Sequence, residues 1–196
     1  MHSIKAFHNY HPDIAIYVAL HHEWVFYWQQ LCKELRFTIR HTITNAGDTR
    51  FETVQNGLRE IAPKGLIAIH DGARPLISRD LITRCFAEAA LHGNAVPFIP
   101  VTDSLREVFE FGNKPVKREQ YAIIQTPQVF LTEIIKLAYE VEYQPAFTDD
   151  ASVVESQGLA IRLVEGEREN IKITLPVDLI IAEALIKNAS ALPRNS

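Results

Sequence analysis

Short apolar runs alternate with stretches of helical periodicity along most of this 196-residue chain. The run at 14–20 is rich in β-branched and aromatic residues and predicts a buried strand, whereas apolar positions over 23–35 recur at helical spacing. The same alternation predicts further strands at 37–44, 66–69, 95–101, 159–164 and 171–174, and further helices at 50–61, after Ser78, at 131–141, at 151–156 and from Pro176. This repeated strand–helix pattern predicts an α/β fold: a doubly wound, mostly parallel, Rossmann-like sheet with helices on both faces.

Two regions depart from this pattern. Residues 103–125 mix short β-like pieces with charges and a glycine turn, which predicts an arm that protrudes from the sheet. Near residue 1, Ile4 and Phe7 begin an apolar helical stripe with no strand before it, although a doubly wound domain normally opens with a strand and a phosphate-binding turn. We therefore expect a single domain over 1–196 in which this first strand and its loop are absent.

The spacing of glycines supports the absence of that loop. The eight glycines lie at least seven positions apart, so no two of them can expose consecutive backbone N–H groups to a phosphate. No glycine-rich phosphate loop is therefore expected within this sequence.

The composition excludes several classes of protein. With 47% hydrophobic residues the chain can bury a core, and its formal net charge of −4 argues against a nucleic-acid-binding surface. The longest apolar run, at 14–20, is far shorter than the roughly 18 residues of a membrane span. Two cysteines that lie far apart, without CxxC spacing, indicate a reduced, cytoplasmic protein.

Polar residues follow three of the predicted strands, at the edge where open α/β sheets bind their ligands. They form the segments 45–50, 70–75 and 102–104, which offer small residues together with Asp, Arg or hydroxyl groups. Each segment alone is a weak signal, since 70–75 is equally typical of a turn with a solvated Arg. Lys172 lies between two isoleucines of a predicted strand and is either a surface charge or a cleft residue. The segment 148–152 is typical of an ordinary helix cap.

Histidine and cysteine patterns add no site of their own. His21, His22 and Glu23 belong to residue types that bind metals, but adjacent residues on an extended chain point apart, and no further ligand has matching spacing. We expect a solvated loop there and no metal site formed by protein side chains. The sequence also contains no Gly-x-Ser-x-Gly elbow and no Cys/His nucleophile arrangement.

A series of short motifs in a fixed order is far more specific than any one of them. The motifs are GDTR at 47–50 with TV at 53–54 and GL at 57–58, HDGARP at 70–75, PVTDS at 100–104, TPQ at 126–128, TDDAS at 148–152, and EG followed by NIKIT between 165 and 174. From about residue 3 to residue 187 the chain thereby resembles the 2-C-methyl-D-erythritol 4-phosphate cytidylyltransferase family of the non-mevalonate isoprenoid pathway. Relatives that act on ribitol 5-phosphate share most of these motifs, so ribitol-5-phosphate cytidylyltransferase is an alternative.

The resemblance implies a fold and a reaction. The fold is a nucleotidyltransferase sheet whose arm, at 103–125, pairs two subunits into a homodimer. In the reaction, the phosphate of a sugar-alcohol phosphate attacks the α-phosphorus of CTP in line and releases pyrophosphate. Mg²⁺, bound mainly through the CTP phosphates, neutralises the triphosphate. Such chemistry depends on positioning and positive charge and needs no protein nucleophile.

The resemblance also implies roles for ten residues, by their positions in the motifs. The positions that hold the cytosine are matched by Gly47, Asp48 and Thr53. The positions at the ribose and the metal-bound phosphates are matched by Asp71 and Gly72. The positions around the acceptor substrate are matched by Arg74, Ser104, Arg118 and Thr126. The catalytic pair that places the acceptor phosphate for attack is matched by Arg118 and Lys172.

In one respect the chain departs from the family. Family members begin with a strand and a glycine-rich turn that contains an Arg, followed by a Pro-Lys-Gln segment, and that Arg and that Lys stabilise charge on the CTP phosphates. Neither element occurs here, so we expect the chain by itself to have little or no activity. A non-catalytic protein that binds phosphosugars or oligomerises is the alternative from another class.

Overall fold

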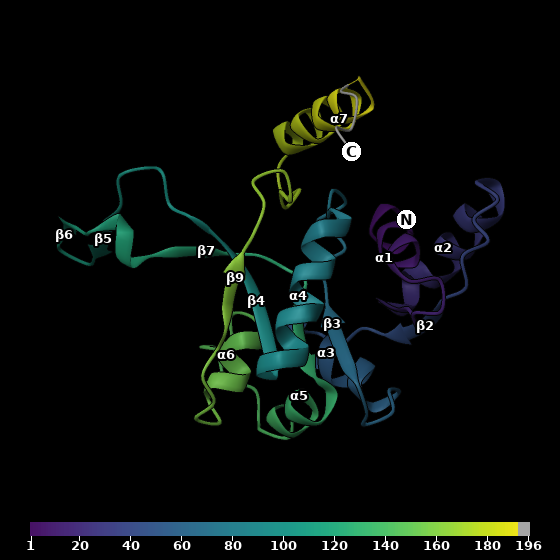
Figure 1. The fold of residues 1–196 in the computed structure, drawn as a ribbon, viewed down its shortest axis with the longest axis horizontal. Coiled ribbons are helices and arrows are strands. Elements are labelled where there is room, and N and C mark those ends of the chain that lie inside the picture. Colours follow the sequence, from purple (N-terminus) through teal and green to yellow (C-terminus); the bar gives the residue numbers. More distant parts are fainter. Residues whose placement is uncertain (192–196) are drawn as a thin grey trace.

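A five-stranded sheet lies at the centre of the computed structural model, which describes residues 1–191 (Figure 1). Its strands are β3 (Leu66–Ile69), β8 (Gln128–Leu131), β4 (Asn94–Pro100), β7 (Ala122–Ile124) and β9 (Leu163–Glu165). The long strand β4 organises this sheet, because β7, β8 and β9 all pair with it.

The expectation of a mostly parallel sheet is wrong. Strand β8 pairs antiparallel with both β3 and β4, β7 pairs antiparallel with β4, and of the described pairs in this sheet the β4–β9 pair alone is parallel. The cause is β8, which the sequence pattern does not predict. It inserts between β3 and β4 and leaves those two strands pointing the same way. The predicted parallel rhythm holds at β1 (Tyr17–Leu20) and β2 (Thr42–Asn45), which pair parallel across α2 (His22–Glu34).

Strands β7 and β8 are successive pieces of one chain segment that follows β4. The last described pair with β8 joins Ala95 to Val129, and the first pair with β7 joins Phe98 to Ile124. Between these two pairs there are three residue steps along β4 but five along its partner segment. Two residues of the partner segment are therefore left out of the regular strand pairing. Thr126 lies in this interruption, at the end of the strand that returns from the arm.

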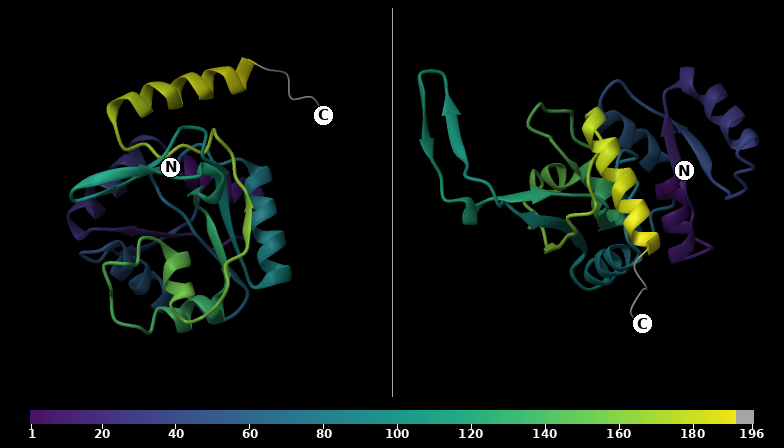
Figure 2. Two further views of the ribbon diagram at one scale, coloured as in Figure 1. Left: turned by 90° about the vertical axis from the view of Figure 1, so that its left-hand side faces the viewer. Right: turned by 90° about the horizontal axis from the view of Figure 1, so that it is seen from above.

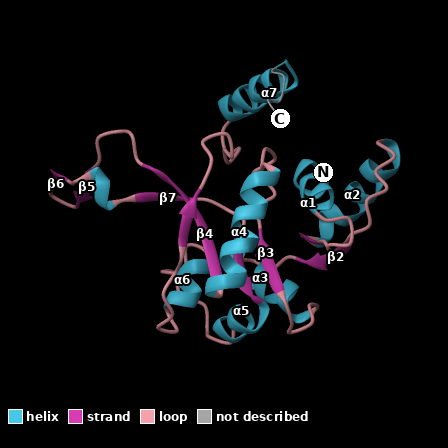
Figure 3. Ribbon diagram, in the orientation of Figure 1, coloured by secondary structure: helices cyan, strands magenta, loops and turns pink. Residues whose placement is uncertain are grey.

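Helices cover both faces of the sheet, as predicted (Figure 3). On one face Phe130 of β8 joins an apolar cluster with residues of α3 (Arg50–Arg59), α5 (Thr132–Ala138) and α6 (Asp150–Glu155). Its neighbour Val129 joins a second cluster with residues of α1 (His2–Tyr10) and α4 (Arg79–His92). Successive strand residues point to opposite faces, so one short strand contributes to two cores.

Three helices begin at the signals that the sequence provides. Thr49 and Glu52 form a capping box that starts α3 at Arg50, and the Ser78 hydroxyl caps α4. Pro176 is the first residue of α7 (Pro176–Ala191). These signals are local in sequence, which is why the sequence predicts correctly where the three helices begin.

A cavity of about 700 Å³ is lined by both β1 and β3. Its walls include residues 14–19 and 66–72, together with residues of α1 and α3, and most of the lining side chains are apolar. Among the described residues, β1 pairs with β2 and β3 pairs with β8, so each of the two strands has a second edge without a strand partner. Polar groups also line the cavity, among them Arg50, Thr53, His70 and Asp71.

The predicted arm is a hairpin that projects far from the sheet (Figure 2). It consists of β5 (Arg106–Phe109), β6 (Gly112–Pro115) and the short helix η1 (Arg118–Gln120), and the chain returns to the sheet through β7. Val108 and Phe111 on the hairpin are 79% and 90% exposed. Apolar side chains with this exposure are suited to burial against another surface.

The strand expected at 171–174 is absent; this stretch has no strand pairing among the described residues. The N–H of Ile173 donates instead to the carbonyl of Ala73, which places the stretch beside the loop after β3. Helix α7 then stands apart from the sheet, with Leu179 and Ile180 exposed (Figure 1). No helix among the described residues has both the length and the hydropathy needed to cross a membrane. That residues 1–196 form a single domain stays a prediction.

Candidate active site

Asp71, in the loop that follows β3, is the centre of a cluster of charges. The ammonium of Lys172 lies 2.9 Å from Asp71 Oδ2, and the Nε atoms of Arg50 and Arg74 each lie 3.6 Å from one of its carboxylate oxygens. Burial alone would raise the pKa of Asp71. The hydrogen bond and charge of Lys172, followed by the two guanidinium charges, outweigh burial and hold this pKa below its usual value. The structure thus brings Asp71, Arg74 and Lys172 together and makes Lys172 a site residue rather than an isolated surface charge.

Arg74 is held in place by backbone carbonyls. It is 9% exposed and donates through Nη1 to the carbonyl of Asn170 at 2.8 Å and through Nη2 to that of Ile124 at 3.4 Å. Burial lowers the pKa of this guanidinium, and the neighbouring Asp71 charge opposes the shift. Its Nε, turned toward Asp71, has no hydrogen-bond partner and contributes charge alone.

His70 and Thr126 fix the backbone at Asp71. The Nε2 of His70 lies 2.9 Å from the carbonyl oxygen of Arg74, and its Nδ1 lies 3.1 Å from the Thr126 hydroxyl. A carbonyl can only accept, so Nε2 carries the proton and the Thr126 hydroxyl donates to Nδ1. The same hydroxyl oxygen accepts the Asp71 N–H at 3.0 Å. The proton of Thr126 is therefore committed to His70, and toward a substrate Thr126 can act as an acceptor.

Neutral His70 predicts a loss of stability in acid. Burial lowers the pKa of His70 to about 4 from 6.5, so between these values the unfolded chain binds a proton that the folded chain does not. The free energy of unfolding should fall by about 3 kcal/mol as the pH drops from 7 to 4 through this group alone. Urea unfolding of wild type and His70→Asn at both pH values measures the difference, with the exposed His11→Asn as control. Equal acid losses in wild type and His70→Asn would contradict it.

Two buried amides hold the segment before Lys172 against the sheet. Gln125 donates to the carbonyl of Glu167 at 2.7 Å and accepts its N–H at 3.1 Å. Asn170, fully buried, donates to the carbonyl of Thr126 at 2.8 Å. A Cβ at Gly166 would lie 2.8 Å from the Phe98 carbonyl oxygen, so a side chain there would push this segment off β4. Lys172 is therefore positioned by a segment that the sheet edge holds closely.

The loop proposed for cytosine is ordered by its own residues. The N–H of Gly47 donates to the Thr53 hydroxyl at 3.0 Å, and that hydroxyl donates to the carbonyl of Thr49 at 2.9 Å. A Cβ at Gly47 would lie 2.3 Å from the Cβ of Glu52, so a tight approach to the capping box requires glycine here. Asp48 is exposed at the tip of this turn.

Two of the residues expected around the acceptor are not part of the Asp71 cluster. Ser104 is exposed in the loop between β4 and β5. Arg118, on the arm, donates to the carbonyl of Thr102 and lies 3.4 Å from Glu119. Within the described part of one chain, the structure gives no contact between Arg118 and either Asp71 or Lys172.

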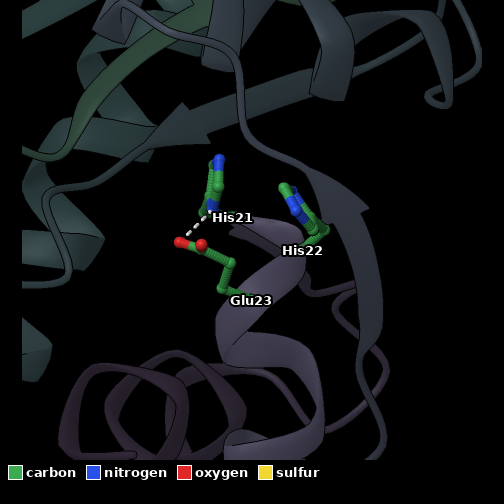
Figure 4. Close-up of side chains that lie close together, drawn as sticks. All are labelled: His21, His22 and Glu23. Atoms are coloured by element: carbon green, nitrogen blue, oxygen red, sulfur yellow. Dashed lines mark ion pairs between the residues drawn. The ribbon is translucent and has the colours of Figure 1, made fainter.

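His21, His22 and Glu23 lie closer together than expected (Figure 4). The two rings are 4.2 Å apart, His21 Nδ1 is 3.1 Å from Glu23 Oε2, and one ligand atom of each residue lies within 4.8 Å of the others. The assumption that the residues point apart is wrong, because they stand at the start of α2 rather than on an extended chain. The positive end of that helix opposes a cation.

Sequence reasoning missed four side chains that build this site: Arg50, His70, Gln125 and Asn170. All four stand in or beside the motif segments quoted above. The partners of Arg50 and Gln125, however, lie 100 and 42 positions away in the sequence. A local pattern marks such residues as polar but does not reveal the partner.

Comparisons with known proteins agree on one family. The family model of IspD, 2-C-methyl-D-erythritol 4-phosphate cytidylyltransferase, matches residues 1–188. The protein of that name from Bacteroides fragilis is 46% identical over 186 residues, which are 95% of this chain and 85% of the relative. The corresponding protein from Bacteroides thetaiotaomicron is 44% identical with the same coverage.

Solved structures give the same result. The crystal structure of 2-C-methyl-D-erythritol 4-phosphate cytidylyltransferase from Thermus thermophilus matches with a TM-score of 0.76 and 32% identity, over 94% of this chain and 88% of the other. A crystal structure of 4-diphosphocytidyl-2C-methyl-D-erythritol synthase matches with a TM-score of 0.82 and 27% identity, over the same shares of the two chains. The family model over residues 1–188, the relatives with 44% and 46% identity and the matching solved structures show that the chain belongs to the 2-C-methyl-D-erythritol 4-phosphate cytidylyltransferase family.

Proposed function

We propose that this chain transfers a cytidylyl group from CTP to 2-C-methyl-D-erythritol 4-phosphate, with release of pyrophosphate, in isoprenoid precursor synthesis. The observation that carries the proposal is the cluster of Lys172, Arg50 and Arg74 around Asp71 at the carboxyl end of β3, in a chain of this family. Three cations at the ligand edge of an α/β sheet suit a reaction between two phosphates. Relatives with 44% and 46% identity carry the methylerythritol name, which favours this acceptor over ribitol 5-phosphate.

In this proposal the protein positions charges and takes no covalent part. Lys172, together with Arg118 of a second subunit, places the acceptor phosphate for in-line attack on the α-phosphorus of CTP. Arg74, Ser104 and Thr126 surround the rest of the acceptor, Thr126 as a hydrogen-bond acceptor. The cytosine is held by Gly47, Asp48 and Thr53, while Asp71 and Gly72 lie at the ribose and the metal-bound phosphates.

The side chains of this site do not form a binding site for Mg²⁺ by themselves. Both oxygens of Asp71 face cations, Oδ1 toward Arg50 and Oδ2 toward Arg74 and Lys172, whereas Mg²⁺ requires free oxygen ligands. A Mg²⁺ ion carried by the CTP phosphates stays part of the proposal, and the roles given to Lys172, Arg74 and Thr126 do not depend on it.

The proposal also includes a homodimer and a cytoplasmic location. The exposed apolar hairpin of the arm supports the dimer, because its two strands pair with each other and bury little in their own chain. The location is supported by Cys32 and Cys85, which are both free thiols.

A further part of the proposal is a strand that enters the cavity lined by β1 and β3. Backbone groups at an unpaired strand edge favour pairing with a further strand, and β1 and β3 each have an edge without a strand partner among the described residues. One extended segment between them would satisfy both edges and join the two-stranded and five-stranded sheets. A strand followed by a glycine-rich loop fits this place and would bring phosphate-binding N–H groups to Asp71. We name residues 1–196 preceded by that strand and loop from a family member the extended chain.

A substrate panel tests the activity. Pyrophosphate release by the extended chain should require CTP and should be at least about tenfold faster, in kcat/KM, with 2-C-methyl-D-erythritol 4-phosphate than with ribitol 5-phosphate, a difference of about 1.4 kcal/mol. The same assay with ATP in place of CTP is the control for the nucleotide. If the extended chain prefers ribitol 5-phosphate, the proposed acceptor is wrong. If no pyrophosphate is released with either acceptor, the result favours a non-catalytic protein.

A further inference from the structure

We propose that Arg50 is a positioning residue of this site: anchored on the buried Asp150, it holds Asp71 so that Lys172 can leave that carboxylate for the acceptor phosphate. The inference rests on the proposed function, because it takes Lys172 as the group that receives the acceptor phosphate. Arg50 is one of the three cations around Asp71 but has no role of its own in the proposed reaction, although it is the first residue of α3 and lines the same cavity as Asp71.

Arg50 is anchored by a bidentate ion pair with Asp150. Nη1 donates to Asp150 Oδ1 at 3.0 Å and Nη2 to Oδ2 at 2.6 Å, and the Tyr139 hydroxyl donates to Oδ1 at 2.6 Å. Asp150 is fully buried, so this guanidinium neutralises its charge where no water can. Burial alone would lower the pKa of Arg50, but the Asp150 charge and hydrogen bonds raise it above its ordinary value. The two hydrogen bonds to Asp150 fix the plane of the guanidinium.

With both Nη atoms bound to Asp150, Nε is the part of Arg50 that faces Asp71. It lies 3.6 Å from Asp71 Oδ1, whereas Lys172 and Arg74 approach the other oxygen, Oδ2. Arg50 therefore acts on one side of the carboxylate and leaves the other side to Lys172 and Arg74. A continuous series of contacts therefore runs from the core to the site, through Tyr139, Asp150, Arg50 and Asp71.

The three cations differ in how firmly they are held. Arg50 is fixed by Asp150, and Arg74 by the carbonyls of Asn170 and Ile124. The side chain of Lys172 is 45% exposed, and Asp71 is the partner that the structure gives it among the described residues. Lys172 is thus the cation that can turn away at the cost of one contact, while Asp71 keeps two fixed positive neighbours. An ammonium on a flexible stem suits such an exchange better than a guanidinium.

Without Arg50, Asp71 would depend more strongly on Lys172. The carboxylate would lose the charge at Oδ1, and Lys172 would be harder to separate from it when a phosphate arrives. A lysine at position 50 keeps the charge but has one nitrogen, which cannot bind both oxygens of Asp150 and face Asp71 at once. Arg50→Lys therefore separates positioning from charge.

The first test follows the Asp71 carboxyl carbon by ¹³C NMR across pH in residues 1–196. We expect Arg50→Lys and Arg50→Gln each to raise the pKa of Asp71 above the wild-type value, because its positive neighbour at Oδ1 is displaced or removed. Arg59→Gln, on an exposed residue of the same helix, is the matched control and should leave it unchanged. Identical titration of Asp71 in wild type and both Arg50 variants would overturn the proposal. If Arg50→Gln does not fold, Arg50→Lys decides.

The second test measures binding of 2-C-methyl-D-erythritol 4-phosphate by calorimetry. Arg50→Lys should weaken binding about tenfold, the equivalent of one charge-assisted hydrogen bond. Asp150→Asn, which removes one negative charge from the chain, should also weaken it, whereas long-range attraction alone predicts tighter binding. Unchanged affinity in Arg50→Lys, or tighter binding in Asp150→Asn, would overturn the positioning role. If wild type itself binds no acceptor, the acceptor site of the proposed function fails and the release of Lys172 fails with it, while the ¹³C result still decides whether Arg50 holds Asp71.

Discussion

The Arg118→Ala and Lys172→Ala variants of the extended chain should each be nearly inactive and should regain activity when their subunits are mixed. Each variant removes a positive group that we place on the acceptor phosphate, and the loss of one such group commonly lowers turnover about 10²–10³-fold. Arg118 lies on the projecting arm and contacts Thr102 and Glu119 rather than the Asp71 cluster of its own chain. In the proposed homodimer, Arg118 would serve the acceptor site of the second subunit.

The recovery follows from the arrangement of a two-fold dimer. In a mixed dimer one site combines an intact Lys172 with an intact Arg118 from the other subunit, and the second site has neither. Random exchange between equal amounts should leave about a quarter of all sites intact. Pyrophosphate release before and after exchange measures this, and a Lys172→Ala sample carried through the same exchange is the control. If mass spectrometry shows that mixed dimers have formed but turnover does not rise, a site shared between subunits is ruled out.

Residues 1–196 alone should turn over at least about 10²–10³-fold more slowly than the extended chain. Each oxyanion-binding donor contributes about that factor, and a phosphate loop after the added strand supplies several. The added strand should also raise the melting temperature, because it would pair with β1 and β3 and fill the 700 Å³ cavity with apolar side chains.

The control for this comparison is the extended chain with a proline in the middle of the added strand. Proline removes a backbone donor from the ladder, so this variant should lose most of the gain in stability and activity. Calorimetric melting and pyrophosphate release report on the two effects separately. Equal turnover with and without the added segment would contradict both the proposed strand and the role given to its loop.

How far the sequence predicts the fold depends on how local the signal is. The caps at Thr49 and Ser78 and the proline at 176 act within one turn of helix, and the helices begin where these residues predict. Strand β8 is different: its residues 128–131 become a strand because β3 and β4 lie on either side, and both partners are distant in sequence. The stretch 171–174 shows the opposite error, since it alternates like a strand but has no strand beside it among the described residues.

The same distinction holds for the site. Motif order points to Asp71 and Lys172, and the structure brings the two within 2.9 Å. Arg50 stands in one of those motifs without a predicted role, because its function depends on Asp150, which is 100 positions away and fully buried. Burial and pairing of charges are properties of the folded chain, so no reading of the motif alone could have assigned them.

At the two-residue interruption between β7 and β8, the chain segment that returns from the arm contacts the site. The strand that returns from the arm runs through Gln125 to Thr126, whose hydroxyl holds the backbone of Asp71. In the proposed homodimer, contacts that hold the arm would therefore also restrain the loop that carries Asp71, because only a few residues separate the two. Thermodynamic reciprocity then requires the converse. If dimer formation through the arm strengthens substrate binding in the proposed homodimer, then bound substrate must strengthen the association of the two subunits by the same factor.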